Sequence, residues 1–150
     1  MHEIELRTLE DTKAIAVRLA KTIKPGDIIC LVGNLGAGKT TFTQMLCEAL
    51  GTDEYVTSPS FSIMNAYTGI LDGAPIPIYH FDVYRISDPD EMDEIGFDDY
   101  LFGKGISIVE WATKVEEYIP ENAIWIELNL TEWGTRIISS SGLEMGEDIK

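Results

Sequence analysis

The sequence has little cysteine and little histidine. Among its 150 residues there are only 2 of each. The cysteines, Cys30 and Cys47, are too few and too far apart for a disulfide framework or a zinc site. A histidine-rich metal site is disfavoured for the same reason. Because free cysteine is among the most buried residue types, we expect both thiols to lie in the core.

Long apolar runs are also missing from the sequence, and the pattern of its first residues does not predict a secretory leader. No run approaches the ~20 apolar residues of a membrane-spanning helix, and residues 1–5 lack the basic and apolar regions of a signal peptide. A hydrophobic fraction of 45% nevertheless indicates a globular chain. We therefore expect a cytoplasmic protein with one domain over residues 1–150, of which 142–150 form a flexible tail.

Basic residues are few. There are 11 lysines and arginines against 26 acidic residues, and the formal net charge is −15. Direct binding to a nucleic-acid backbone is disfavoured, because it needs lysine and arginine to neutralise phosphates. Two interpretations of the acidic surface stay open: a solvated face, or a face that attracts a basic partner protein.

Patterns of apolar residues predict alternating helices and strands. Residues 8–11 have the spacing of a capping box, which predicts a helix to about residue 22. The wholly apolar run 28–32 is typical of a strand covered on both faces. A helix beginning near Lys39 should end before Gly51. Further strands are expected at 61–66, 78–83, 106–109, 124–130 and 136–139, and the last two should pair through the turn 131–135. Short helices are expected at 113–118 and after residue 88, the latter with Pro89 as its first helical residue.

One glycine-rich stretch carries the clearest functional signal. Residues 33–40, GNLGAGKT, fit the phosphate-binding pattern G-x-x-x-x-G-K-[ST] in full. Its glycines let backbone N–H groups turn inward onto phosphate oxygens, and the helix that follows adds its positive N-terminal end. Lys39 should reach the β- and γ-phosphates, and the Thr40 hydroxyl should bind Mg²⁺. The predicted nucleotide-binding residues of this segment are Gly33, Asn34, Leu35, Gly36, Ala37, Gly38, Lys39, Thr40 and Thr41.

The position of this loop, between an apolar strand and a helix, also predicts the fold. Strands alternate with helices along most of the chain, which is typical of a parallel sheet. We expect an α/β fold like that of the P-loop NTPases. It should have three layers, with a mostly parallel sheet, some antiparallel strands, and helices on both faces.

Two carboxylates follow strand-like runs and would complete the site. Glu110 ends the run 106–109, and Asp82 ends the run 78–81. In a parallel sheet both fall at the carboxyl edge beside the loop, where acidic residues hold Mg²⁺ or its waters during phosphoryl transfer. An acid after a strand is also often a helix cap or a solvated loop residue, and this alternative stays open for each.

Three further observations bear on the chemistry. Residues 57–61, TSPSF, follow the P-loop helix where many such proteins sense the γ-phosphate, although a proline-stiffened start of a strand is the alternative. The guanine-reading signature Asn-Lys-x-Asp is missing, which favours adenine. Only four arginines occur in the chain, and no segment resembles the arginine-rich lid of a small-molecule kinase.

Four motifs in order, GNLGAGKTTF, TSPSF, YHFDVYR and VEWA, make the sequence similar to the TsaE (YjeE) family of bacterial ATPases. That family serves the synthesis of threonylcarbamoyladenosine in tRNA, and the resemblance runs from about Thr8 to Arg136. It implies a small P-loop fold that binds ATP with Mg²⁺ and associates with the TsaD–TsaB pair, whose cycle ATP hydrolysis resets. In that case tRNA is met only through these partners, and no membrane is involved.

The resemblance also implies roles for single residues. It assigns Thr40 and Glu110 to Mg²⁺, and it makes Asp82 a functional position. In the hypothesis that we favour, Asp82 orients the attacking water or holds the metal's outer shell. Trp111 and the segment 8–12 match positions near the nucleotide base, although a core aromatic beside the strand is the alternative for Trp111. The predicted catalytic residues are Lys39, Asp82 and Glu110; the predicted metal residues are Thr40, Asp82 and Glu110; and the predicted nucleotide contacts outside 33–41 are Thr8, Thr12, Ser60, Trp111 and Arg136.

These observations favour a Mg²⁺-dependent ATPase subunit for tRNA modification. Its activity alone should be weak, since no arginine finger is evident unless Arg85 acts as one or a partner supplies it. Two other classes of function stay open. One is a small-molecule kinase, and the other is a nucleotide-dependent interaction module whose bound ATP orders a partner-binding surface.

Overall fold

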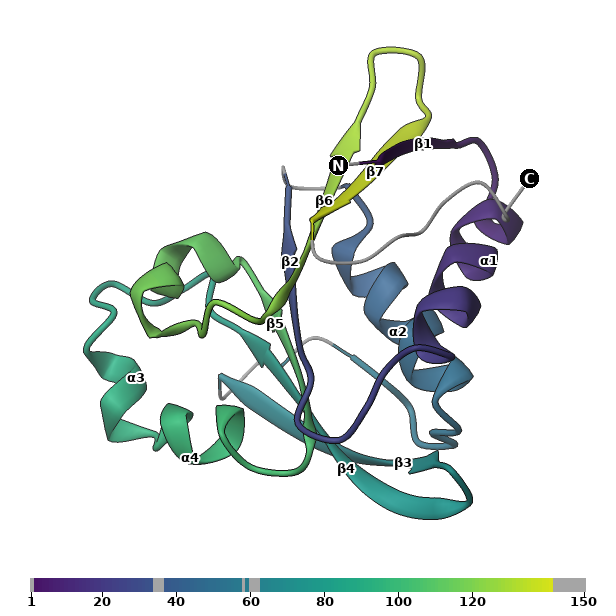
Figure 1. Ribbon diagram of the computed structural model, residues 1–150. Helices are drawn as coiled ribbons and strands as arrows, with labels where there is room; N and C mark the ends of the chain where they lie inside the picture. The colour runs from purple at the N-terminus through teal and green to yellow at the C-terminus, as the bar shows by residue number, and fades with distance from the viewer. Residues whose placement is uncertain (1, 34–36, 58, 60–62, 142–150) are drawn as a thin grey trace.

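The computed structural model describes residues 2–33, 37–57, 59 and 63–141. One sheet of 7 strands runs through them in the order β1-β7-β6-β2-β5-β4-β3 (Figure 1). The strands are β1 (His2–Leu6), β2 (Ile28–Val32), β3 (Met64–Leu71), β4 (Ala74–Asp82), β5 (Ile106–Glu110), β6 (Ile124–Leu130) and β7 (Arg136–Ser141). The helices are α1 (Leu9–Ala20), α2 (Lys39–Ala49), α3 (Glu91–Glu94), α4 (Phe97–Leu101) and the 3₁₀ helix η1 (Ala112–Tyr118).

The centre of the sheet is parallel and its edges are antiparallel. β2 pairs in parallel with β5 on one side and β6 on the other, and β5 pairs in parallel with β4. β3 adds to β4, and β7 and β1 add beyond β6, in antiparallel register. The predicted pairing of β7 with β6 is confirmed, and a hydrogen bond from Thr131 N to the Thr135 carbonyl closes their turn.

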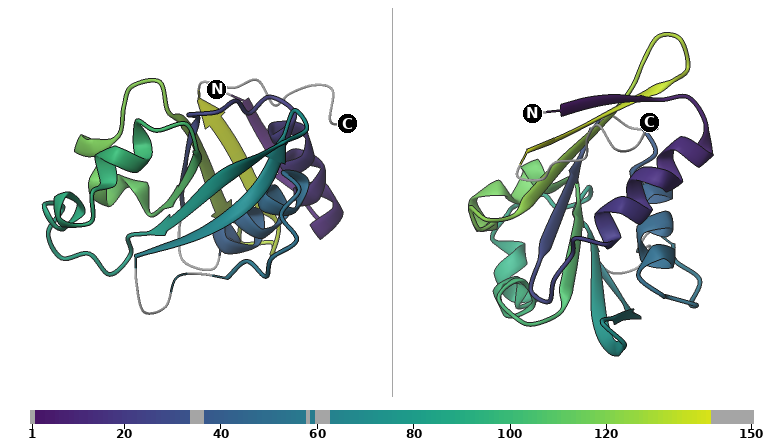
Figure 2. Two further views of the ribbon diagram at one scale, coloured as in Figure 1. Left: turned by 90° about the horizontal axis from the view of Figure 1, so that it is seen from below. Right: turned by 45° about the vertical axis from the view of Figure 1, so that its right-hand side comes forward.

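Helices cover both faces of the sheet, as predicted. On one face α1 and α2 contribute residues such as Leu19 and Phe42 to a buried core. On the other face α3, α4 and η1 surround a second core, where the rings of Phe81 and Phe97 meet edge to face at 4.9 Å between centroids. Figure 2 shows these two groups of helices on opposite sides of the twisted sheet. This double cover explains why β2 is apolar along its whole length.

The two thiols lie in these cores. Cys30 and Cys47 are both free and buried, which confirms the prediction. Burial raises the pKa of each to about 12, so both are inert neutral thiols at physiological pH. None of the helices in the described part of the chain is long and apolar enough to cross a membrane.

Several predicted elements differ in detail from the structure. The strand expected at 78–83 begins earlier, at Ala74, and ends at Asp82. Of the strand expected at 61–66, residues 61 and 62 lie outside the described residues; β3 begins at Met64 and continues to Leu71, because it pairs along its length with β4. Pro89 is not the first helical residue, since α3 begins at Glu91. The Glu91 carboxylate accepts hydrogen bonds from the backbone N–H groups of Ser87 and Asp88, which hold the preceding segment in a turn.

Candidate functional site

The glycine-rich loop joins β2 to α2 as predicted, and neighbouring strands crowd its backbone. At Gly33, where φ is +142°, a Cβ would lie 1.8 Å from the carbonyl oxygen of Leu128 in β6. At Gly38, where φ is +96°, a Cβ would lie 2.9 Å from Nε of Arg136 in β7. Only glycine lets the loop approach these strands so closely.

Arg136 supports this loop from β7. Its Nε donates a 2.9 Å hydrogen bond to the carbonyl of Ala37, which is fully buried. The guanidinium therefore stabilises the turn that leads into α2. A direct contact of Arg136 with nucleotide stays a prediction. The same holds for the predicted contacts that lie outside the described residues, namely those of Asn34, Leu35, Gly36 and Ser60.

The close approach at Gly33 predicts a large loss of stability for Gly33→Ala. We expect the free energy of unfolding in urea to fall by about 3 kcal/mol or more, because the new methyl group adds backbone strain and overlaps Leu128. The matched control is Gly73→Ala, where φ is +79° and nothing lies within 4 Å of a new Cβ. There only backbone strain acts, at about 1–2 kcal/mol. Equal losses in the two variants would contradict the crowding around Gly33.

Lys39, at the start of α2, is 5% exposed. Its Nζ donates a 2.9 Å hydrogen bond to the Gly33 carbonyl and lies 4.1 Å from the centroid of the Trp111 ring. Burial lowers the pKa of Lys39, while the charges of Glu110 and Asp82 act in the opposite direction. The amine thus lies desolvated between a carbonyl and an aromatic face, where an anion is the partner that would stabilise it most.

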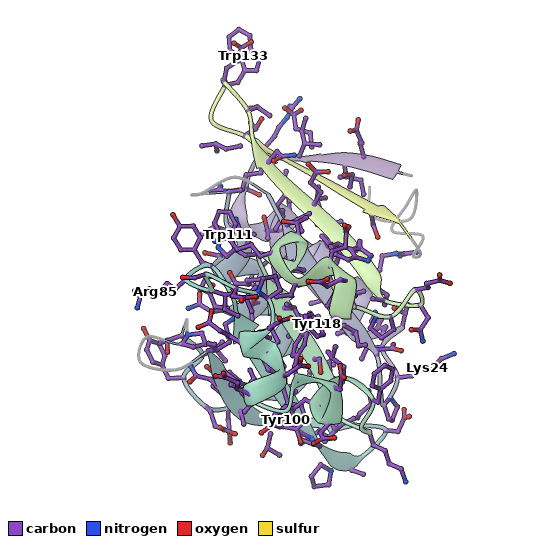
Figure 3. All side chains as sticks on the ribbon, turned by 90° about the vertical axis from the view of Figure 1, so that its left-hand side faces the viewer. Lys24, Arg85, Tyr100, Trp111, Tyr118 and Trp133 are labelled. Carbon is purple, nitrogen blue, oxygen red and sulfur yellow. The ribbon has the colours of Figure 1, made fainter. Side chains whose placement is uncertain are left out.

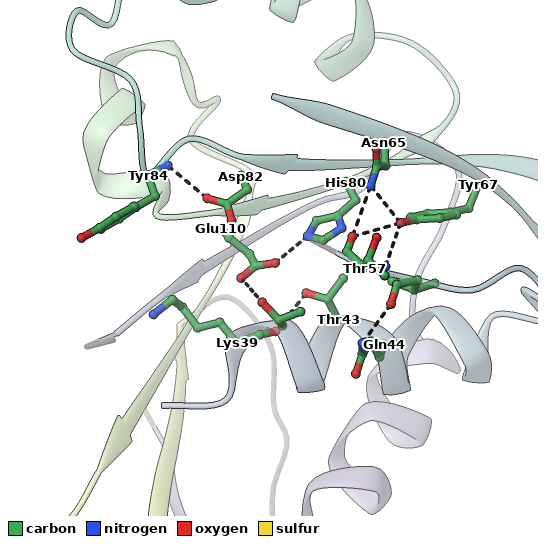
Figure 4. Close-up of polar contacts among 12 residues, drawn as sticks. Lys39, Thr43, Gln44, Thr57, Asn65, Tyr67, His80, Asp82, Tyr84 and Glu110 are labelled. Atoms are coloured by element: carbon green, nitrogen blue, oxygen red, sulfur yellow. Dashed lines mark hydrogen bonds and ion pairs between the residues drawn. The ribbon is translucent and has the colours of Figure 1, made fainter. Parts of the chain in front are cut away.

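Glu110 is the most connected carboxylate of the site and is 2% exposed. Its Oε1 accepts a 3.1 Å hydrogen bond from the hydroxyl of Thr40, and its Oε2 lies 2.5 Å from Nε2 of His80 (Figure 4). Asp82 on β4 is the register partner of Glu110 on β5. The structure therefore brings together the three residues predicted for the metal, from α2 and from two adjacent strand ends.

Asp82 is half-buried and lies beside the same corner of the sheet. Its Oδ1 accepts a 3.1 Å hydrogen bond from the backbone N–H of Tyr84. Burial raises the pKa of Asp82 and the charge of Glu110 adds to the rise, whereas the bond from Tyr84 opposes it. A carboxylate with raised proton affinity at a strand end is suited to orient water.

The side chains at this corner fit Mg²⁺ by their chemistry. The Thr40 hydroxyl and the carboxylates of Glu110 and Asp82 are hard oxygen donors, which Mg²⁺ prefers. In the part of the chain that the structure describes, no group of three or more His, Cys, Asp or Glu side chains could hold a metal ion. A nucleotide site needs no such cage, because phosphate oxygens and waters complete the shell of Mg²⁺.

His80 is a site residue that the sequence analysis did not select. It is fully buried and contacts Glu110 from the neighbouring strand. The signal that could have found it is strand alternation: His80 lies two positions before Asp82, and residues two apart in a strand share a face. That face is the one on which α2 lies.

Trp111 follows Glu110 with a φ of +64°, which is uncommon for a bulky residue. This turn places its ring over the Lys39 amine and against Tyr84, at 4.6 Å between ring centroids. Lys114 lies over Tyr84 in turn, 5.0 Å from its ring centroid. Trp111 also packs against the second core. The alternative interpretation of Trp111, as a core aromatic beside the strand, is therefore partly correct. Its predicted place beside the base stays a prediction.

A hydrogen-bond network anchors the start of the segment 57–61 near the site (Figure 4). The Tyr67 hydroxyl accepts from Thr57 N at 3.2 Å and donates to the Thr57 carbonyl at 3.1 Å. The Asn65 amide donates to the same carbonyl, and Gln44 of α2 donates to the Val56 carbonyl at 2.8 Å. The segment therefore starts from a point fixed to β3 and α2.

The remaining predicted contacts lie in the first turns of the two long helices. The predicted capping box is confirmed, because the Thr8 hydroxyl accepts from Asp11 N and the Asp11 carboxylate accepts from Thr8 N. The Thr12 hydroxyl donates to the Thr8 carbonyl at 3.5 Å. Thr41 lies in the first turn of α2 and is partly exposed. Contacts of Thr8, Thr12 and Thr41 with nucleotide stay predictions.

Comparisons with known proteins agree in both sequence and structure. The family model described as "Threonylcarbamoyl adenosine biosynthesis protein TsaE" matches residues 6–138. The tRNA threonylcarbamoyladenosine biosynthesis protein TsaE of Bacillus subtilis is 45% identical over 128 residues, or 84% of this chain and 77% of that protein. Its counterpart from Treponema pallidum is 32% identical over 133 residues, or 89% and 95%. The crystal structure of Bacillus subtilis YdiB matches with a TM-score of 0.71 at 39% identity, over 91% of this chain and 82% of that one.

Proposed function

The chain belongs to the TsaE family, and from that premise we propose that it is an ATP-binding and ATP-hydrolysing subunit required for threonylcarbamoyladenosine modification of tRNA. In this proposal it works with Mg²⁺ in the cytoplasm. It acts on a TsaD–TsaB-type complex and resets the catalytic cycle of that complex. The names of the curated relatives support the pathway, and the geometry of the site supports the hydrolysis.

One observation supports the proposal of ATP hydrolysis. The Lys39 amine, the Thr40 hydroxyl and the Glu110 carboxylate converge where the phosphate-binding loop meets the ends of β4 and β5. Phosphoryl transfer needs little covalent chemistry from a protein, and it depends on positioning and on charge stabilisation. A cation beside the loop and oxygen donors at the strand ends are the groups that such a site requires.

Each residue has a defined role in this proposal. Lys39 exchanges its carbonyl partner, Gly33, for the β- and γ-phosphates of ATP. Thr40 and Glu110 hold Mg²⁺ directly or through water, and Asp82 orients the attacking water or holds the metal's outer shell. Bound Mg²⁺ supplies positive charge to the phosphate oxygens. Trp111 keeps water away from one side of the Lys39 amine.

The charge distribution supports dependence on a partner. A net charge of −15 disfavours a direct grip on tRNA, so tRNA is met through the partner proteins. Arg85 is exposed and lies at the edge of the molecule on the side of Trp111 (Figure 3). An arginine finger therefore comes from the partner complex or from a movement of Arg85, and the isolated subunit is expected to be slow.

The test is phosphate release measured with and without the TsaD–TsaB pair, in either order of addition. We expect the pair to stimulate turnover by about 100-fold or more, which is the smallest gain typical of one added charge-stabilising group. The TsaD–TsaB pair alone is the control. No stimulation in any order of addition would count against the proposal. A phosphorylated acceptor in place of free phosphate would instead indicate a small-molecule kinase.

A further inference from the structure

Both carboxylate oxygens of Glu110 have a protein partner, and one of these partners is outside the predicted site. Oε1 accepts from the Thr40 hydroxyl at 3.1 Å, and Oε2 lies 2.5 Å from Nε2 of His80. His80 is 0% exposed and Glu110 is 2% exposed, so no bulk water competes for either group. The pair is therefore a buried contact between adjacent strands.

The surroundings of His80 hold its ring in place. β4 lies between β3 and β5 in the sheet, and the register pairs His80 with Asn65 on one side and with Ile108 on the other. The Tyr67 ring lies 6.5 Å away between centroids. A glutamate carboxylate turns easily about its last side-chain bond, because that torsion is broad. His80, which is fixed in the sheet, holds one carboxylate oxygen of Glu110, and the Thr40 hydroxyl of α2 holds the other. Together these two partners remove this freedom.

Fold stability alone does not explain an imidazole at this position. Among the described residues, Nδ1 of His80 is buried without a hydrogen-bond partner. An unpartnered buried polar atom costs free energy that an apolar side chain of similar size would avoid. The contact with Glu110 is therefore the interaction that explains a polar ring at this position.

We propose that His80 is a positioning residue, which fixes the orientation of the Glu110 carboxylate and so sets the affinity of the nucleotide site for Mg²⁺. The inference rests on the proposed function, because it takes Glu110 as a metal residue. With Oε2 held by His80, Oε1 and the Thr40 hydroxyl are left to the metal. Partners of this kind change metal affinity by about 10- to 100-fold when they are removed.

Three variants test the role. The Nε2 of glutamine reaches about as far along the side chain as the Nε2 of histidine, so His80→Gln keeps a donor for Glu110. His80→Asn places its amide nearer the backbone, and His80→Leu has no donor. Binding of a non-hydrolysable ATP analogue is followed by calorimetry while Mg²⁺ is titrated, after melting temperatures show which variants fold. We expect His80→Asn and His80→Leu to raise the Mg²⁺ concentration at half-saturation about 10- to 100-fold, and His80→Gln to restore most of the loss.

A matched control comes from the neighbouring strand. Among the described residues, Ser107 on β5 is also buried with an unpartnered hydroxyl. It lies three positions before Glu110 in the strand, so the two side chains leave β5 on opposite faces. Ser107→Ala should leave the Mg²⁺ requirement unchanged, and in excess EDTA all the variants should bind the analogue as the parent does.

The outcomes separate this inference from the proposed function. If His80→Leu does not fold, the comparison of glutamine with asparagine decides. Equal Mg²⁺ requirements in those two variants, or an unchanged requirement in a folded His80→Leu, would overturn the inference and leave the proposed function standing. A parent protein whose nucleotide binding ignores Mg²⁺ would overturn the proposed function and this inference with it.

Discussion

Replacing Lys39 with alanine is expected to lower ATP turnover by about 100-fold or more and to leave the fold intact. The amine lies at the Gly33 carbonyl with little solvent access, so it is a positive charge already in place for phosphate. Removing one such preorganised group typically costs about 100- to 1,000-fold in rate. Phosphate release under saturating ATP measures the loss, and calorimetry shows whether binding is lost as well.

The fold should survive because the charge of Lys39 does not stabilise it. Burial lowers the pKa of this amine relative to the unfolded chain, so folding disfavours its protonated form. The resulting loss of stability acts at pH values below the lowered pKa and disappears as pH rises above the unfolded value. Removing the amine therefore costs no stability through its charge, and an unchanged or slightly raised melting temperature is expected.

A matched control for this variant is Lys24→Ala. Lys24 is exposed in the turn before β2, well away from Trp111 in Figure 3. The Lys24→Ala substitution should alter neither ATP turnover nor the melting temperature. Full hydrolysis by a folded Lys39→Ala variant would contradict the assignment of Lys39 to the phosphates.

The sequence predicted the parts of the site that depend on local pattern. The glycine spacing around Lys39 follows from the way backbone N–H groups must turn onto phosphate. The strand-like runs before Asp82 and Glu110 placed both acids at the ends of strands. Parallel strands share a carboxyl edge, so the convergence of these acids with the loop followed from the fold class. None of these steps required knowledge of which strands are neighbours.

Contacts that depend on strand register and on unusual backbone could not be predicted in the same way. The contact of His80 with Glu110 exists because β4 and β5 are adjacent and in one register. The stacking of Trp111 on Lys39 depends on the left-handed φ of Trp111, for which the residue type gives no signal. β1 was not predicted, because it is a short edge strand whose pairing partner, β7, comes from the other end of the chain.

Replacing Glu110 with glutamine is expected to lower turnover by about 100- to 1,000-fold while the variant still folds. The amide has the shape of the carboxylate and retains an acceptor oxygen and a donor for its neighbours Thr40 and His80. What it lacks is the negative charge that a bound metal ion requires. Phosphate release measures the loss, and Glu116→Gln, at an exposed glutamate of η1, is the matched control.

The same variant separates hydrolysis from the role of a nucleotide-dependent interaction module. If ATP only orders a partner-binding surface, Glu110→Gln and Asp82→Ala should keep both the complex with the TsaD–TsaB pair and the modification of tRNA while hydrolysis is lost. If hydrolysis resets the partner, the complex should still form. Modification should then stop after about one cycle per complex, because no step returns the partner complex to its starting state. Counting modified tRNA per complex distinguishes the two. Continued modification by a variant that releases no phosphate would contradict the ATPase role and leave the nucleotide site as a structural switch.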